Sequence, residues 1–194
     1  MCSVQRSTPP AGRYEMPRVL PARTDFAGLR GRRVLAVVDD DNLTISLAEC
    51  VRRLRYGTLL SAIRRVADTV TGCVVLTCAA GDGRPRRHLE GLGWRVVAVP
   101  REVVRTHRGA EVKANADMDL CFEAARLVGE GVFDVVLVGS GDGDLCVSVA
   151  RGVRRAAPWC DVVSLSVRES SSTRLFTRPD LFDRNILIGY DITR

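Results

Sequence analysis

The sequence predicts an α/β protein, built as a three-layer α/β/α sandwich around a mostly parallel sheet of five strands. Short apolar runs alternate along the chain with stretches whose apolar residues recur at helical spacing. The runs are continuous, which is typical of strands that are buried on both faces of a parallel sheet. A length of 194 residues with 46% hydrophobic residues is enough for one such domain with a substantial core.

The first 30 residues differ in character from the remainder. They contain four prolines and scattered arginines, and their apolar residues follow no sustained period. This composition predicts a flexible or loosely docked N-terminal tail over residues 1–30. The folded domain is therefore expected to span residues 31–194.

Five apolar runs give the positions of the expected strands. These are residues 34–38, 73–79, 94–100, 134–140 and 161–167. A further run, "RNILIG" at residues 184–189, leaves open a short sixth strand or an extension that packs against an edge of the sheet.

Apolar residues at helical spacing give the expected helices. These are residues 43–54, 59–70, 88–92, 117–128 and 144–157. Gly57 separates the first two helices, and Pro158 ends the last one. Residues 101–112 have no clear period and are predicted to form a long basic loop.

The charge and cysteine content narrow the function classes. The net charge is +6, and nearly all of the 29 basic residues are arginine, whose planar guanidinium suits phosphate contacts. This favours a polyanionic partner, although an arginine-biased composition without any partner remains an alternative. The seven cysteines include no CxxC pair, which predicts reduced core residues and a cytoplasmic protein. Because no apolar run approaches the ~20 residues of a membrane span, no membrane association is expected.

Acidic residues follow the first expected strand directly, in the segment "VVDDDN". Ligands of a parallel sheet bind beyond the carboxyl ends of its strands, and Asp39 is best placed over that edge. A helix N-cap explains one member of the group, with Asp41 or Asn42 as the expected cap. It does not explain three consecutive acids, so Asp39 is a candidate site residue. Asn42 is expected either to cap the helix or to orient a ligand.

A second acid, Asp117, opens the helix expected at residues 117–128. At ~100° per residue, the apolar side chains of this helix fall within roughly 80° of Asp117. Asp119 falls on the opposite side and is expected to be solvated. A carboxylate on the buried face is costly unless something pairs with it, so a functional role is predicted for Asp117.

The third acidic segment is "SGDGDL", in which Asp142 and Asp144 follow the fourth strand. An ordinary strand–turn–helix connection, with Asp144 as the cap, is the simpler interpretation of this segment alone. Together, Asp39, Asp117, Asp142 and Asp144 would meet at one edge of one sheet. Four carboxylates without a cysteine or histidine donor are a ligand set for a hard cation, and we expect Mg²⁺ or Mn²⁺.

The segments "VLAVVDDDN", "KANADMDLCFEAARL" and "VVLVGSGDGDLCVSVARGVR" resemble the NYN domains of the PIN-like nuclease superfamily. The resemblance runs from about Val34 to Leu187, and "SGDGDL" after an apolar strand is its most specific part. It implies a metal-dependent ribonuclease, and an endonuclease in particular. By position, it assigns Asp39, Asn42, Asp117, Asp142 and Asp144 to the catalytic site.

An RNA substrate needs groups that hold its backbone. Arg101, Arg105, Arg108 and Lys113 border the same sheet edge and are candidate phosphate contacts, unless they form only a solvated basic face. Ser171 and Ser172, after the fifth strand, are further candidates, although a polar loop also explains them. Aromatic residues make up only 5% of the chain, which favours recognition of single-stranded or flexible RNA by its backbone. The sequence leaves open whether the chain forms a homodimer.

Two other functions remain as alternatives. A non-catalytic RNA-binding module would keep the basic residues and lack the chemistry. A haloacid-dehalogenase-type phosphatase would use Asp39 and Asp41 as nucleophile and acid, with Asp142 and Asp144 at Mg²⁺. That pattern requires Thr or Val where Leu43 stands, which argues against it.

Overall fold

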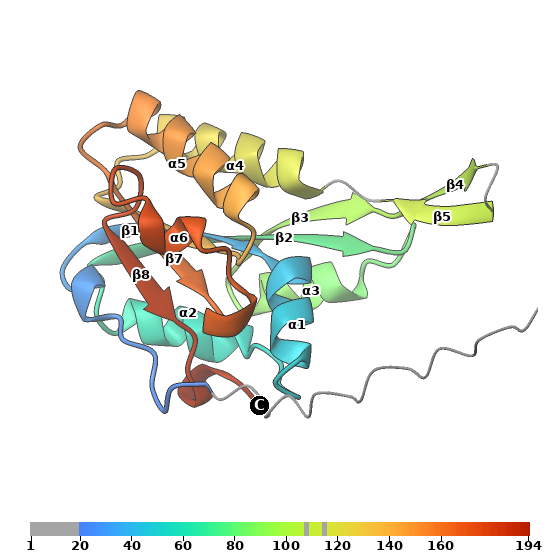
Figure 1. The fold of residues 1–194 in the computed structure, drawn as a ribbon, viewed down its shortest axis with the longest axis horizontal. Coiled ribbons are helices and arrows are strands. Elements are labelled where there is room, and N and C mark those ends of the chain that lie inside the picture. Colours follow the sequence, from blue (N-terminus) through green and yellow to red (C-terminus); the bar gives the residue numbers. More distant parts are fainter. Residues whose placement is uncertain (1–19, 107–108, 114–115) are drawn as a thin grey trace, which may run out of the picture.

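The central element of the protein is one parallel sheet of six strands in the order β3-β2-β1-β6-β7-β8, seen in Figure 1. The computed structural model describes residues 20–194 except 107–108 and 114–115, and it describes the backbone alone for residues 102–106 and 109–113. The strands are β1 (Arg33–Asp39), β2 (Thr69–Cys78), β3 (Arg95–Pro100), β6 (Val135–Gly139), β7 (Asp161–Ser166) and β8 (Arg184–Leu187).

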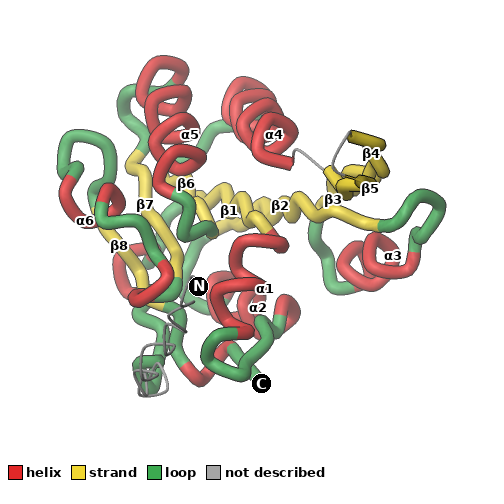
Figure 2. Tube along the Cα trace, turned by 45° about the vertical axis from the view of Figure 1, so that its right-hand side comes forward, coloured by secondary structure: helices red, strands yellow, loops and turns green. Residues whose placement is uncertain are grey.

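Helices cover both faces of this sheet, which gives the three layers that the sequence predicts. On one face lie α4 (Ala116–Glu130) and α5 (Gly143–Ala156), and on the other lie α1 (Asp40–Ala48), α2 (Tyr56–Arg64) and α3 (Arg84–Gly91), as Figures 1 and 2 show. A short helix, α6 (Arg174–Thr177), packs beside α5. The α/β sandwich is therefore confirmed.

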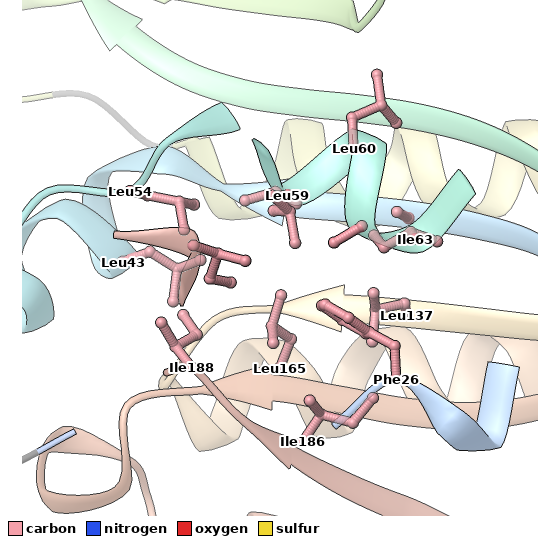
Figure 3. Packing of buried hydrophobic residues seen from close by; sticks show 14 of the residues in the cluster. Phe26, Leu43, Leu54, Leu59, Leu60, Ile63, Leu137, Leu165, Ile186 and Ile188 are labelled. Carbon is pink, nitrogen blue, oxygen red and sulfur yellow. The ribbon is translucent and has the colours of Figure 1, made fainter. Parts of the chain in front are cut away.

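Two apolar cores separate the layers, because the strands send alternate side chains to opposite faces. Val34, Ala36 and Val38 of β1 point into one core, and Leu35 and Val37 point into the other. Figure 3 shows the first core, where Leu59 and Ile63 of α2 pack against the sheet. Both faces of β1 are fully buried, which explains its continuous apolar run.

The chain reverses its direction of travel across the sheet between β1 and β6. The strands β1, β2 and β3 follow one another toward one edge, and β6, β7 and β8 follow one another toward the other edge. The first residues after β1 and β6 therefore lie next to each other, since Val38 pairs in register with Gly139. Such a reversal opens a crevice beyond the carboxyl ends of the strands.

Some details of the sequence prediction were wrong. The sheet has six strands and not five, because the run near residue 184 forms β8 and pairs with β7. The expected loop at residues 101–112 contains an antiparallel hairpin of β4 (Glu102–Thr106) and β5 (Gly109–Lys113), which projects from the sheet in Figure 1. The first helix ends at Ala48, and Val70 belongs to β2 instead of α2.

The ordered fold begins before residue 31. Leu20, Phe26 and Leu29 are buried in the first core, and a 3-10 turn spans Ala27–Leu29. Residues 1–19 of the expected tail lie outside the described residues. Within the part of the chain that the structure describes, no helix is long and apolar enough to cross a membrane.

Candidate metal and RNA site

A shallow depression of about 180 Å³ lies at the switch point between β1 and β6. Its wall brings together three of the acids that the sequence selects, from three separate elements. The lining residues are Asp39, Asp41, Asn42, Ile45, Thr77, Ala116, Asp117 and Asp142. We call it the acidic depression. A single water occupies roughly 30 Å³ of the liquid, so this volume corresponds to about six waters, which is enough for a partly hydrated ion.

Asp39 is the most buried acid of the acidic depression, with 6% of its surface exposed. It ends β1 and also caps α1, where its Oδ1 accepts a hydrogen bond from the backbone N–H of Asn42 at 3.1 Å. The N-cap is therefore Asp39 itself, and neither Asp41 nor Asn42 as the sequence suggested. Burial raises the pKa of Asp39 to about 6, and the Asp117 carboxylate adds to the rise.

Ser140 connects the two strand ends and was not selected by the sequence analysis. The hydroxyl of this fully buried residue donates to Asp39 Oδ2 at 3.2 Å and accepts from the backbone N–H of Asp142 at 3.1 Å. It therefore fixes the orientation of Asp39 relative to the turn that carries Asp142. A serine between an apolar strand and an acidic turn was the available signal.

Asn42 joins α1 to the same turn from the other side. Its Oδ1 accepts a hydrogen bond from the backbone N–H of Gly141 at 2.7 Å. A Cβ at position 141 would lie 3.2 Å from this oxygen and from the Ser170 carbonyl, so glycine permits the close approach. The side-chain amide nitrogen of Asn42 has no partner among the described residues, which leaves its two N–H groups available to a ligand.

Asp142 caps α5 with one of its two carboxylate oxygens. Its Oδ1 accepts from the backbone N–H groups of Asp144 at 2.8 Å and Leu145 at 3.2 Å. Its Oδ2 has no partner among the residues that the structure describes. Asp142, and not Asp144, is therefore the helix cap, and it keeps one oxygen for a ligand.

Asp117 lines the acidic depression but is not buried as the helical wheel predicted. It is exposed to solvent, whereas Leu120, one turn further along α4, is buried. Partial burial and the neighbouring Asp142 carboxylate still raise the pKa of Asp117. The Asp117 carboxylate thus raises the pKa of Asp39, and the Asp142 carboxylate raises the pKa of Asp117, so these charges lie close enough to repel one another.

Asp144 lies outside the acidic depression. It is largely exposed on α5 and forms an ion pair with Arg174. Its predicted role as a metal ligand therefore has no geometric support. Asp41, which the sequence analysis considered as a helix cap or as the acid of a phosphatase, lines the depression and accepts from the backbone N–H of Thr77 at 3.0 Å.

The predicted RNA contacts fall into three groups. Arg101 stands at the rim, where it donates to Thr77 Oγ1 at 2.8 Å and lies 3.6 Å from an Asp41 oxygen. Arg105 lies on β4 and Lys113 on β5, and their side chains are not among the described parts. Arg108 lies outside the described residues.

The serine loop supports the acidic turn from behind. Ser171 donates its hydroxyl to the Val167 carbonyl, and the backbone N–H of Ser172 donates to the Gly141 carbonyl at 2.9 Å. Gly143 permits this contact, because a Cβ there would clash with the Ser172 side chain. The backbone of Ser172 therefore holds the turn in place, and the Ser171 hydroxyl is bonded within its own loop, while both residues remain partly exposed.

The oxygen-only donor set fits a hard divalent cation, but it is not gathered into a ready cage. Within the described residues, no group of three His, Cys, Asp or Glu side chains is placed to hold an ion as it stands. Mg²⁺ commonly keeps several waters and uses only one or two carboxylates together with substrate phosphates. The residues Asp39, Asp117 and Asp142 therefore suit an ion that is bound partly through water.

Comparison with known proteins defines the class of fold. The chain matches no protein-family model and no curated protein, so the NYN resemblance stays a prediction. A structure of a protein of unknown function from Vibrio parahaemolyticus is similar, with a TM-score of 0.68 and 20% identity over 85% of this chain and 98% of that chain. MurG of Acinetobacter baumannii aligns with a TM-score of 0.45 and 11% identity over 79% of this chain and 40% of that chain. The first of these likenesses shows a shared α/β fold.

Proposed function

We propose that this protein is a metal-dependent ribonuclease that hydrolyses RNA phosphodiester bonds, as the NYN resemblance implies. One observation carries the proposal: Asp39, Asp117 and Asp142 converge on one depression, and no arginine of the described residues is paired with them. Carboxylates that repel one another without a neutralising partner are costly to the fold. A divalent cation and a phosphate group would remove that cost.

The roles of the residues follow from their contacts. Asp39, Asp117 and Asp142 would hold the ion, and Ser140 keeps the first of them oriented toward the turn. When bound, Mg²⁺ or Mn²⁺ supplies an activated water and charge for the pentavalent transition state. Asn42 directs its amide N–H groups toward a phosphate oxygen or an attacking water. Asp144 is excluded from this set by its ion pair with Arg174.

RNA is supported as the substrate by the charge of the chain and by the rim. The net charge of +6 favours a polyanion, and Arg101 is half-exposed beside the acidic depression. A shallow site without aromatic lining suits a flexible strand held by its backbone. The buried Cys73, Cys146 and Cys160 form no disulfide, which fits the expected reducing cytoplasm.

The experiment is digestion of a labelled single-stranded RNA with Mg²⁺, with Mn²⁺ and with EDTA. We expect cleavage with either metal and none with EDTA. Binding of RNA without cleavage under all three conditions would favour the non-catalytic module. Turnover of a generic phosphomonoester without RNA cleavage would favour the phosphatase. Either result would reject the proposed function.

A further inference from the structure

A second concave surface lies on the other side of the start of α1. Two hollows of about 390 and 570 Å³ share Asp40, Leu54, Tyr56 and Arg194 in their walls and therefore form one continuous groove. Both are larger than the acidic depression. We call this surface the arginine groove, because its walls also carry Arg52, Arg53 and Arg55.

The arginines of this groove are not paired with a carboxylate of the described residues, whereas Arg32 and Arg33, for example, are. In the described part of the chain, no carboxylate forms an ion pair with Arg53, Arg55 or Arg194. Arg52 lies over the ring of Tyr190, with 4.9 Å from its guanidinium carbon to the ring centroid. Four arginine side chains line one groove, and Asp40 is the one acidic side chain in its described walls, which favours an anionic ligand.

The backbone that carries these arginines is held firmly. Arg53 and Arg194 exchange two backbone hydrogen bonds of 2.9 and 3.0 Å, and the N–H of Arg55 donates to the Ile192 carbonyl at 2.9 Å. The C-terminal segment is thus paired with the segment that precedes α2. This pairing fixes the spacing of the arginines before any ligand arrives.

The smaller hollow also offers backbone donors. Tyr56, Gly57 and Thr58, the first turn of α2, all line it, and no side chain caps this helix. The N–H groups of a first turn have no partner within the helix and attract anions. Together with Arg55 and Arg194, they can bind a phosphate group at the mouth of the hollow.

The inner wall of the same hollow suits a flat ring with hydrogen-bond donors. Leu76, Pro85, Leu89 and Leu92 supply apolar surface. Asp40 supplies a carboxylate whose position is fixed, because the Tyr56 hydroxyl donates to its Oδ1 at 2.6 Å. Trp94 packs edge-on against the Tyr56 ring, and its indole N–H donates to the Tyr56 carbonyl at 3.2 Å.

Asp40 distinguishes among the nucleobases by its chemistry. Its Oδ2 has no hydrogen-bond partner among the described residues. Its Oδ1 accepts from the Tyr56 hydroxyl at 2.6 Å and from the Thr44 hydroxyl at 3.4 Å, and the second of these bonds is long and exposed, so a base N–H can replace it. Guanine presents two adjacent donors, N1–H and N2–H, on its Watson–Crick edge, and these match the two oxygens of a carboxylate. Adenine, cytosine and uracil each place an acceptor beside a donor on that edge, so they would direct a lone pair at the carboxylate.

The arginine groove adjoins the acidic depression. Asp40 lines the groove while its neighbour Asp41 lines the depression, and Leu76 and Thr77 are divided in the same way. One strand of RNA could therefore lie across the start of α1 and the end of β2, with consecutive nucleotides on the two sides.

We propose that the arginine groove binds a guanine nucleotide of the substrate strand, with Asp40 accepting from the base and Arg55 and Arg194 holding its phosphate. That this nucleotide belongs to an RNA substrate rests on the proposed ribonuclease function. The binding of a guanine nucleotide does not, because it needs neither the metal nor the acidic depression.

The test is titration of the protein with guanosine 5′-monophosphate in EDTA, followed by NMR or calorimetry. We expect binding at least about fivefold tighter than for the adenosine, cytidine and uridine monophosphates. Asp40→Asn should abolish this preference, since the amide replaces one acceptor with a donor, and the Tyr56 hydroxyl can still donate to the amide oxygen. Arg55→Gln should weaken all four nucleotides at least about fivefold. Equal affinity of the wild type for the four nucleotides, or no binding, would overturn the proposal.

A matched variant controls for a general loss of positive charge. Arg65→Gln removes an exposed arginine at the opposite end of α2, outside the groove. It should bind as the wild type does. An equal loss in Arg65→Gln and Arg55→Gln would contradict a phosphate site at the start of α2. Circular dichroism and thermal melting show that each variant is folded.

RNA cleavage separates the failure of this inference from the failure of the proposed function. An RNA with a single guanosine should be cut next to that base by the wild type and without preference by Asp40→Asn. Metal-dependent cleavage without guanine preference would reject the inference and leave the ribonuclease in place. Guanosine monophosphate binding without cleavage of any RNA would reject the ribonuclease and leave the nucleotide site in place.

Discussion

The carboxylates at the two ends of the central sheet differ in whether they are paired with arginine. At the amino ends of the strands, Asp134 pairs with Arg33 at 2.6 Å and Asp161 pairs with Arg32 at 2.9 Å. At the carboxyl ends, four acids face one depression. Asp41 lies 3.6 Å from Arg101, but Asp39, Asp117 and Asp142 have no arginine of the described residues paired to them. The chain is rich in arginine, so the difference comes from where the arginines lie and not from how many there are.

The consequences for protonation are also opposite. The Arg33 guanidinium holds the pKa of Asp134 well below its usual range. Burial raises the pKa of Asp39 to about 6. One end of the sheet therefore gains stability from its charges, and the other end carries a charge that the fold opposes. Unfavourable charge of this kind is typical of functional sites, which leads to tests that compare the two ends.

The largest expected difference lies in activity. Asp142→Asn at the carboxyl end should lower the rate of RNA cleavage at least about a hundredfold, since it removes a ligand and a charge at the reacting phosphate. Asp161→Asn at the amino end is the matched control and should cleave at a rate near that of the wild type. The measurement is the initial rate on labelled RNA at saturating Mg²⁺. Wild-type cleavage by Asp142→Asn would remove the acidic depression from the mechanism.

The next difference lies in the free energy of unfolding. Asp39→Asn should stabilise the metal-free protein at pH 7, because the amide keeps one acceptor and removes a buried charge. The pKa shift of Asp39 sets an upper bound of about 3 kcal/mol on the gain. Urea unfolding of both proteins in EDTA measures it. A large loss of stability would mean that the charged form is needed by the fold itself.

The raised pKa of Asp39 should also make the stability of the protein depend on pH. The folded protein holds a proton on Asp39 more tightly than the unfolded chain, whose pKa is near 3.8. The contribution of Asp39 is therefore fully present below pH 4 and is lost as the pH rises through about 6. Unfolding of the wild type minus that of Asp39→Asn, measured between pH 4 and 7 in EDTA, isolates it. A flat difference would show that Asp39 titrates normally.

At the amino end, the substitution should have the opposite sign. Asp134 accepts from the backbone N–H and from two side-chain nitrogens of Arg33. Asp134→Ala should destabilise the protein by about 1 kcal/mol, since Arg33 remains half-exposed and can be solvated. RNA cleavage should not change. Urea unfolding at pH 7 checks the first statement, and a fall in cleavage that exceeds the loss of folded protein would contradict the second.

The sequence was sufficient for the features that depend on local pattern. Continuous apolar runs predicted the buried strands, and the position directly after a strand predicted that Asp39 and Asp142 share one edge. The four-residue strand β8 was ambiguous, because its apolar part is too short to separate a strand from an edge extension. Residues 1–30 have no periodicity, yet Phe26 and Leu29 fill the core by tertiary packing alone.

The errors at the site come from information that is not local. The helical wheel gives the angle of Asp117 around the helix but not how much of the first turn of α4 other elements cover, so its exposure was missed. Asp144 is paired with Arg174, which lies 30 residues further along the chain, so the sequence around Asp144 does not report this contact. The place of Ser140 between an apolar strand and an acidic turn was a local signal, but its hydrogen bond to Asp39 spans 101 residues, so the sequence pattern does not identify its partner.

Substitution of Ser140 should have the smallest effect on stability, and it tests directly what sets the pKa of Asp39 at the carboxyl end of the sheet. Ser140→Ala removes the hydrogen bond to Asp39 and leaves the Asp142 N–H without its acceptor. The loss should cost about 1 kcal/mol of stability at pH 7. It should also raise the pKa of Asp39 further, because that hydrogen bond lowers it. Two pairs of proteins differ only by Asp39→Asn: the wild type and the single variant, and Ser140→Ala and the double variant. The contribution of Asp39 to stability, measured as the difference within each pair, should therefore persist to a higher pH in the Ser140→Ala pair. An unchanged pH profile would mean that Ser140 only fills space, and that Asn42 alone orients the acid at the end of β1.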